Sequence, residues 1–349
     1  MRALIVGLGS IGRRHARNWA ALKAGRLAIC RQRNLPQPEP LGVEAPEYHD
    51  LDQALQAERP DVVLVTNPTS LHVSAARRAI EAGAHVLVEK PLGSSTDGVA
   101  ELVAAARERG RCLMVAYNLR FHPGLVRTKA LLDQHVIGRV VSARAEASEY
   151  LPDWHPWEDY RAGYSARRDL GGGAVLTFSH ELDALCWLLG APRQVAAMTA
   201  QSSSLDLDVE DLAEILLTFD GGALASVHLD YVRRAPRRTI ELVGEQGVLR
   251  WDYHRNQVAL YTLDTRQWRL EDGQPTYTRN QMYMDELRYF VDAVRGGAAK
   301  RPDLDGRQGA AVLGLALATL RSAAEGRTID LHAEDRTTRE CLSSFNRRA

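Results

Sequence analysis

The segment Gly7-Leu8-Gly9-Ser10-Ile11-Gly12 decides the fold of this chain, because it joins a short aliphatic run to a stretch with helical spacing. A glycine-rich turn between a strand and a helix is the setting in which the GxGxxG pattern binds a dinucleotide. The first glycine permits the tight turn, the second lets the backbone approach a pyrophosphate, and the third allows close packing of helix on strand. We therefore predict that Gly7, Gly9, Ser10, Ile11 and Gly12 bind a dinucleotide at a helix N-terminus. The alternative is a glycine-rich turn without a ligand.

Outward from this segment, the first third of the chain alternates between two hydrophobic periods. Short aliphatic runs are separated by stretches in which apolar residues recur with helical spacing. These runs are 3–6, 27–30, 61–65, 85–88 and 112–116. Continuous apolar strands joined by helices are typical of a parallel sheet covered on both faces, so we predict a doubly wound α/β domain here.

After Asn118 the pattern changes to longer and more polar strand candidates. In the run 223–231, alternate residues are apolar and the residues between them are polar, which indicates a strand with one buried face. We predict a mostly antiparallel sheet between Val140 and Leu270. Two helices are expected to follow, at 282–295 and 308–324. A length of 349 residues agrees with two domains.

Composition excludes several classes of function. Lysine and arginine together number 44, as do aspartate and glutamate, and this balance argues against nucleic acid or an anionic membrane as the main partner. No apolar run is long enough for a membrane span, and the N-terminus resembles no export signal, so a cytoplasmic protein is expected. The four cysteines lie far apart, so we predict neither a disulfide framework nor a metal site.

The residues after the second aliphatic run bear on which dinucleotide is bound. An acid at this position would accept hydrogen bonds from the ribose of NAD, but the chain has Arg31 and Arg33 there instead. Guanidinium groups suit a 2′-phosphate, so NADP is favoured over NAD. The alternative is that both arginines are solvated loop residues.

Three further segments carry a family resemblance: Thr66-Asn67-Pro68-Thr69-Ser70-Leu71-His72, Glu89-Lys90-Pro91 and Tyr117-Asn118-Leu119-Arg120-Phe121. Together with the glycine segment they resemble the Gfo/Idh/MocA oxidoreductases over nearly the whole chain. The resemblance implies a Rossmann domain at 1–119 and a C-terminal α/β domain at 120–349, with a large open sheet for substrate binding and oligomerisation. It also implies NAD(P)-linked hydride transfer at a hydroxyl-bearing carbon of a sugar, sugar nucleotide, inositol or related compound, in a homodimer or homotetramer.

Lys90 is the predicted catalytic acid/base. It follows the fourth strand, at the carboxyl edge of the sheet where ligands of such folds bind, and a lysine desolvated beside a nicotinamide would have its pKa lowered toward the working range. The alternative is a lysine that only covers a loop. The remaining predicted cofactor contacts are Thr66, Asn67, Pro68, His72, Glu89, Lys90 and Asn118, although His72 is equally expected to pack in its helix.

A second site segment runs from Gly171 to Asp183. Members of the family often carry Asp at the position of Thr177 and His at the position of Glu181, whereas this chain has His180 one residue earlier. On one continuous helix these three residues would share a face, so His180 is predicted to assist catalysis; a buried structural histidine is the alternative. The predicted substrate contacts are Lys90, Arg120, Tyr164, Thr177 and His180.

Two other functions remain open at the level of sequence. One is a dinucleotide-binding regulator that kept the fold and lost turnover, which the missing acid at Thr177 favours and the presence of Lys90 opposes. The other is a reductase of C=N or C=C bonds.

Overall fold

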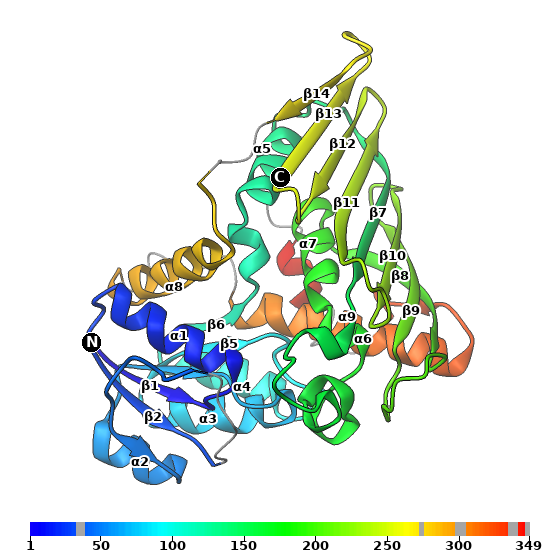
Figure 1. Cartoon of the computed structure of the whole chain (residues 1–349). Coiled ribbons are helices and arrows are strands. Elements are labelled where there is room, and N and C mark those ends of the chain that lie inside the picture. The colour runs from blue at the N-terminus through cyan, green and yellow to red at the C-terminus, as the bar shows by residue number, and fades with distance from the viewer. Residues whose placement is uncertain (33–38, 272–275, 297–304, 334–340, 346–349) are drawn as a thin grey trace. The chain divides into compact units, whose positions relative to one another are not determined.

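The computed structural model describes residues 1–32, 39–271, 276–296, 305–333 and 341–345. The chain forms two compact units (Figure 1). The first unit comprises residues 1–117, 169–171 and 283–313, and the second comprises 118–168, 172–282 and 314–349. Each unit therefore contains segments that are distant in sequence, whereas the predicted domains 1–119 and 120–349 are each continuous.

The first unit is built on a six-stranded parallel sheet with the order β3-β2-β1-β4-β5-β6. The strands are β1 (Arg2–Val6), β2 (Arg26–Cys30), β3 (Glu47–Tyr48), β4 (Val62–Val65), β5 (His85–Glu89) and β6 (Leu113–Ala116). The helices between them are α1 (Ser10–Ala21), α2 (Leu51–Glu58), α3 (His72–Glu81) and α4 (Val99–Glu108). All four residues of β4 are buried, as expected for a strand with helices on both faces. The prediction of a doubly wound sheet is confirmed.

Strand order reverses between β1 and β4 in this sheet. In open α/β sheets the crevice at such a switch point, outside the carboxyl ends of the strands, is where ligands bind. The glycine segment follows β1, Thr66 and Asn67 follow β4, and Lys90 follows β5. The residues predicted to bind the dinucleotide therefore gather at one edge of one sheet.

The second unit contains a nine-stranded sheet with the order β14-β13-β12-β11-β7-β10-β9-β8-β15. Its strands are β7 (Val140–Ser148), β8 (Pro192–Ala200), β9 (Leu212–Phe219), β10 (Leu224–Asp230), β11 (Arg237–Gly244), β12 (Gly247–Asp252), β13 (Gln257–Thr262), β14 (Trp268–Glu271) and β15 (Ile329–Asp330). The pairing is antiparallel except between β7 and β10, which run parallel along seven residue pairs from Leu224 to Asp230. The mostly antiparallel sheet is confirmed, and the parallel pair at its centre is an addition.

The two faces of this sheet differ in composition. Ala225, Val227 and Leu229 are fully buried on one face, whereas His228 between them is only half-buried on the other. The helices α5 (Pro123–Asp133), α6 (Ala174–Thr177) and α7 (Ser179–Leu189) lie on the buried face, as the green ribbons of Figure 1 show. The other face carries the exposed apolar side chains Leu216 and Leu224, each with half of its surface accessible.

The remaining elements complete both units. Helices α8 (Arg279–Arg295) and α9 (Gly306–Glu325) correspond to the two helices predicted near the end of the chain. Single 3-10 turns lie at Thr69–Leu71, Asn118–Phe121, Leu151–Asp153, Tyr160–Ala162, Tyr164–Ala166, Arg168–Leu170 and Ser343–Phe345. Within the described ranges, no helix combines the length and the hydropathy required to cross a bilayer.

Candidate functional site

The glycine segment forms a cradle, and glycine is required at Gly7 and at Gly12 for different steric reasons. Gly7 has a φ of +98°, and a Cβ there would lie 2.6 Å from the backbone nitrogen of Asn67. A Cβ at Gly12 would lie 2.2 Å from the carbonyl oxygen of Gly7, so α1 can approach β1 only with glycine at that position. Thr66 fixes the turn from the neighbouring strand, since its hydroxyl donates to the carbonyl of Gly7 at 2.7 Å. Side chains at Gly7 and Gly12 would therefore push the loop apart.

The same cradle leaves room for an anion at the start of α1. Gly9 is the N-cap residue and offers no side-chain hydrogen bond to the helix, and a Cβ at Gly9 would meet nothing within 4 Å. The backbone at Gly9 is thus unobstructed where a 12-residue helix begins, and the first N–H groups of such a helix suit a pyrophosphate. Asn67 adds a buried side-chain oxygen that has no hydrogen-bond partner among the described residues. These residues fit a dinucleotide.

The arginine predicted to select NADP is engaged with an acid. The guanidinium of Arg31 lies 2.7 Å from the carboxylate of Glu47, the first residue of β3, and its Nε donates to the same oxygen at 2.9 Å. The side chains of Arg31 and Glu47 are 22% and 38% exposed, so both remain reachable from solvent. Arg33, the second arginine of that prediction, lies outside the described residues. An acid absent from the local sequence is therefore brought beside Arg31 by strand pairing.

Lys90 follows β5 and is half-buried, and its neighbours fix the backbone around it. Glu89 accepts a hydrogen bond from Nε2 of His15 at 2.9 Å, and its other oxygen accepts from the backbone N–H of Lys90 at 3.3 Å. His15 is fully buried and Glu89 is 7% exposed. The peptide bond between Lys90 and Pro91 is cis. Glu89 therefore acts on the backbone of this segment, in keeping with a positioning role.

His72 contacts two backbone carbonyls. Its Nδ1 lies 2.8 Å from the carbonyl oxygen of Pro91 and its Nε2 lies 2.8 Å from that of Asn67. The ring is 1% exposed, and burial lowers the pKa of His72 while the two carbonyls and the nearby charge of Glu89 oppose that change. Both ring nitrogens of His72 thus contact backbone carbonyls, in keeping with the alternative that His72 packs at the start of its helix.

In the second unit, Arg120 is committed to a buried ion pair. Its Nε and Nη2 donate to the two carboxylate oxygens of Asp183 at 2.9 and 2.6 Å, and both side chains are at most 4% exposed. This bidentate geometry ties the turn Asn118–Phe121 to α7. Asn118 in the same turn is also buried. The geometry assigns Arg120 a structural partner, which the predicted role in substrate binding did not include.

The segment carrying His180 is not one continuous helix. α6 ends at Thr177, Phe178 has φ −93° and ψ +30°, and α7 begins at Ser179. The continuous helix on which Thr177, His180 and Glu181 were expected to share a face is therefore not formed, because α6 and α7 are separate helices on either side of Phe178. His180 and Thr177 are 7% and 3% exposed, and Tyr164 is half-buried at the start of its own 3-10 turn.

Glu181, which occupies the position of the usual family histidine, lies in a buried ion pair. Its carboxylate lies 2.9 Å from Nε of Arg238, and the two side chains are 1% and 9% exposed. An ionised carboxylate at this depth is stabilised only by such a partner.

The sequence matches two family models. Residues 1–117 match the model described as an oxidoreductase family with an NAD-binding Rossmann fold, and residues 125–250 match a GFO/IDH/MocA C-terminal domain. The chain belongs to the Gfo/Idh/MocA oxidoreductase family. As a Gfo/Idh/MocA protein it is an NAD(P)-dependent oxidoreductase acting on CH–OH groups.

Individual Gfo/Idh/MocA relatives cover most of the chain. A 1,5-anhydro-D-fructose reductase of Ensifer adhaerens is 28% identical over 274 residues, covering 78% of this chain and 80% of that protein. A myo-inositol 2-dehydrogenase of Thermotoga maritima is 27% identical over 352 residues, covering 95% and 98%. The crystal structure of GenD2 from gentamicin A biosynthesis, in complex with NAD, is 28% identical, covers 95% of this chain and 97% of that chain, and has a TM-score of 0.78.

Three functional candidates in this Gfo/Idh/MocA chain were missed at the level of sequence. His15 lies three residues after Gly12 on the buried side of α1, which is the one signal that could have marked it. Glu47 becomes visible only through the pairing of β2 with β3. Glu210 accepts from the backbone N–H of Val175 at the start of α6, and burial raises the pKa of its carboxyl.

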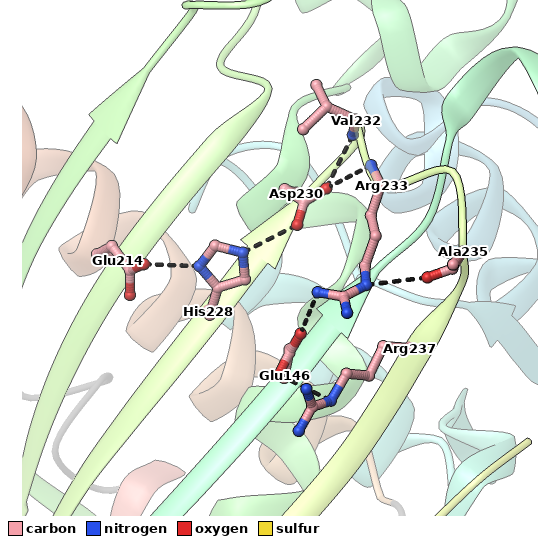
Figure 2. Close-up of polar contacts among 8 residues, drawn as sticks. All are labelled: Glu146, Glu214, His228, Asp230, Val232, Arg233, Ala235 and Arg237. Atoms are coloured by element: carbon pink, nitrogen blue, oxygen red, sulfur yellow. Dashed lines mark hydrogen bonds and ion pairs between the residues drawn. The ribbon is translucent and has the colours of Figure 1, made fainter.

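A separate polar cluster lies on the exposed face of the nine-stranded sheet (Figure 2). His228 lies between Glu214 and Asp230, with ring nitrogens 2.6 and 2.9 Å from their carboxylates. Hydrogen bonds to Asp230 and Glu214 raise the pKa of His228 to about 9. Glu146 beside it contacts Arg233 and Arg237, each at 3.1 Å. These charges of opposite sign lie beside one another across four strands and one loop. No group of three or more potential metal-ligating side chains occurs within the described ranges.

Proposed function

We propose that the protein transfers hydride between a nicotinamide and a hydroxyl-bearing carbon of a sugar, sugar nucleotide, inositol or related compound, with Lys90 as the acid/base. The observation that carries this proposal is the placement, on one sheet edge, of the glycine cradle after β1 and of Lys90 after β5. Sugar and inositol substrates are supported by the names of the relatives from Ensifer adhaerens and Thermotoga maritima.

The chain's own groups have distinct tasks in this reaction. A bound nicotinamide supplies the hydride acceptor or donor. During oxidation the hydride would leave the substrate carbon with the C–H electron pair for that acceptor, the O–H bond would break as a C=O bond forms, and the neutral amine of Lys90 would take the proton. His15 and Glu89 hold the backbone at Lys90. We propose His180, in the first turn of α7, as a second polar group for the substrate hydroxyl, with Thr177 and Tyr164 as further contacts.

NADP remains our proposal for the preferred dinucleotide. The expected difference in affinity between NADP and NAD is smaller than two arginines without an acidic neighbour would give. Arg31 can meet a 2′-phosphate through charge-assisted hydrogen bonds. Glu47 competes for the same guanidinium and can itself accept from a ribose hydroxyl. NAD is therefore expected to bind as well.

We further propose that the protein is a cytoplasmic homodimer or homotetramer. Met198, Leu216 and Leu224 are 78%, 50% and 50% exposed on the open face of the nine-stranded sheet, and apolar groups on such a face favour contact with a second copy. All four cysteines are free thiols, which supports a reducing compartment.

Turnover of a substrate panel tests the proposed function. Purified protein is mixed with NAD or NADP and with myo-inositol, aldoses, 1,5-anhydro sugars and sugar nucleotides, and reduction of the nicotinamide is followed by absorbance. Lys90→Met should lower kcat by about 10² to 10⁴ and leave dinucleotide affinity nearly unchanged, because it removes the proton acceptor and leaves the cradle intact.

Lys23→Met is the matched control for this test. It makes the same change at an exposed lysine and should behave as the unmodified protein. Near-normal kcat in Lys90→Met would remove Lys90 from the mechanism. Tight dinucleotide binding without turnover of any substrate in the panel would favour a regulator.

A further inference from the structure

We infer that His15 and His72 are positioning residues. Each forms a hydrogen bond to the Glu89–Pro91 segment, and together they fix the position of Lys90. The inference rests on the proposed function, because it assigns these histidines a task only if Lys90 takes part in proton transfer. Both side chains are almost completely buried, at 0% and 1% exposure, and both come from helices that begin beside the switch point of the first sheet.

His15 acts on Lys90 through hydrogen bonds of Glu89. His15 belongs to α1, the helix that starts at the glycine cradle, and its Nε2 donates to Glu89 Oε1 at 2.9 Å. A carboxylate can only accept, so Nε2 carries the proton in this contact. The second oxygen of Glu89 accepts the N–H of Lys90. A chain of two hydrogen bonds thus connects the dinucleotide helix to the backbone of Lys90.

His72 contacts Pro91, the residue after Lys90. His72 is the first residue of α3, and its Nδ1 contacts the carbonyl of Pro91 while Nε2 contacts the carbonyl of Asn67. Asn67 belongs to the turn that supports Gly7 and holds a buried oxygen without a partner among the described residues. One imidazole therefore connects the dinucleotide-lining turn after β4 to the Lys90 segment after β5.

The two contacts of His72 can be tested one at a time, because a neutral imidazole has too few N–H donors for two carbonyls. A carbonyl oxygen only accepts, and a neutral imidazole has a single N–H. Both contacts are full hydrogen bonds only in the imidazolium form, whose charge is opposed by burial and by Lys90 and favoured by Glu89. Amide side chains can replace one contact at a time, because an Asn nitrogen lies near the place of Nδ1 and a Gln nitrogen near that of Nε2.

The two amide variants should therefore have opposite effects. His72→Asn keeps a donor toward Pro91, so it should retain more kcat, and it loses the tie to Asn67, so it should bind NADH and NADPH more weakly. His72→Gln keeps the tie to Asn67, so it should retain dinucleotide affinity, and its kcat should fall about tenfold to a hundredfold, as expected when a reacting group is displaced by about 1 Å. At His15 the order reverses: Gln keeps the donor to Glu89, and Asn should lose kcat.

The experiment measures kcat with the panel substrate that the unmodified protein oxidises, and dissociation constants by fluorescence titration with NADH and NADPH, which needs no substrate. Thermal denaturation tests whether each variant folds. His135→Asn, at an exposed position in the second unit, is the control. Equal effects of Asn and Gln on kcat and on affinity at position 72, as a purely structural role would give, would overturn the inference.

Lys90→Met belongs in the same series, so that the two failures can be told apart. If Lys90→Met keeps its kcat, the proposed role of Lys90 fails. If Lys90→Met loses kcat while every variant at His15 and His72 matches the unmodified protein, only the inference that these two histidines position Lys90 fails.

Discussion

Glu47 and Arg31 show how a neighbouring strand changes the chemistry of one side chain. The guanidinium of Arg31 points toward a carboxylate that arrives 16 residues later in the sequence. A 2′-phosphate must displace or share that carboxylate, whereas a ribose hydroxyl can use it. The choice between two dinucleotides is thus set by a competition within the protein.

Removing the competitor should shift dinucleotide preference toward NADP. Glu47→Gln leaves Arg31 free to meet the 2′-phosphate, and we expect the ratio of NADH to NADPH dissociation constants to rise about threefold to tenfold, the scale of a partly exposed ion pair. Calorimetric titration of both dinucleotides measures this ratio. Glu44→Gln, an exposed acid nearby, is the control, and an unchanged ratio in Glu47→Gln would mean that Arg31 does not meet the phosphate.

At the level of elements, strands and the glycine turn were readable from sequence, because their signals are local. The aliphatic run Ala3–Val6 and the turn at Gly7 follow from residue types a few positions apart. Contacts between distant segments had no such signal. Asp183 meets Arg120 across 63 residues, and β7 pairs in parallel with β10 because of the topology of the whole sheet. The break at Phe178 was missed because the flanking residues are all compatible with a helix.

Strand β10 allows a test of stability against pH. The raised pKa of His228 means that its charged form is favoured in the folded state, so its stabilising effect is complete below the ordinary histidine pKa of about 6.5. The effect should diminish as pH rises and should be lost above about 9. The difference in melting temperature between the unmodified protein and His228→Gln should therefore be largest near pH 6 and smallest near pH 10, with buffers about one pH unit apart.

The exposed histidine variant His135→Gln serves as the comparison for this series. A difference for His228→Gln that stays constant, or grows with pH, would show that the Glu214–His228–Asp230 contacts do not stabilise the strand through charge.

For the whole molecule, the open sheet face predicts assembly. Light scattering coupled to gel filtration should give a mass about two or four times the 38.7 kDa of the chain. Leu216→Glu places a charge in the exposed apolar patch and should shift the protein toward the monomer. Val126→Glu, at an exposed position on α5, should leave the mass unchanged. A monomer of the unmodified protein at micromolar concentration would contradict both the interface and the oligomer.

The interrupted first unit has a consequence for synthesis on the ribosome. Gly306 and Gly309 of α9 approach Leu113 and Val115 of β6 so closely that a Cβ on either glycine would lie 2.5 Å or less from those side chains. The nascent chain must therefore present β6 without this cover while most of the second unit is still being translated. A chain truncated just before residue 306 would lack this cover on β6, so we expect truncation there to destabilise the dinucleotide-binding unit although residues 1–117 are intact.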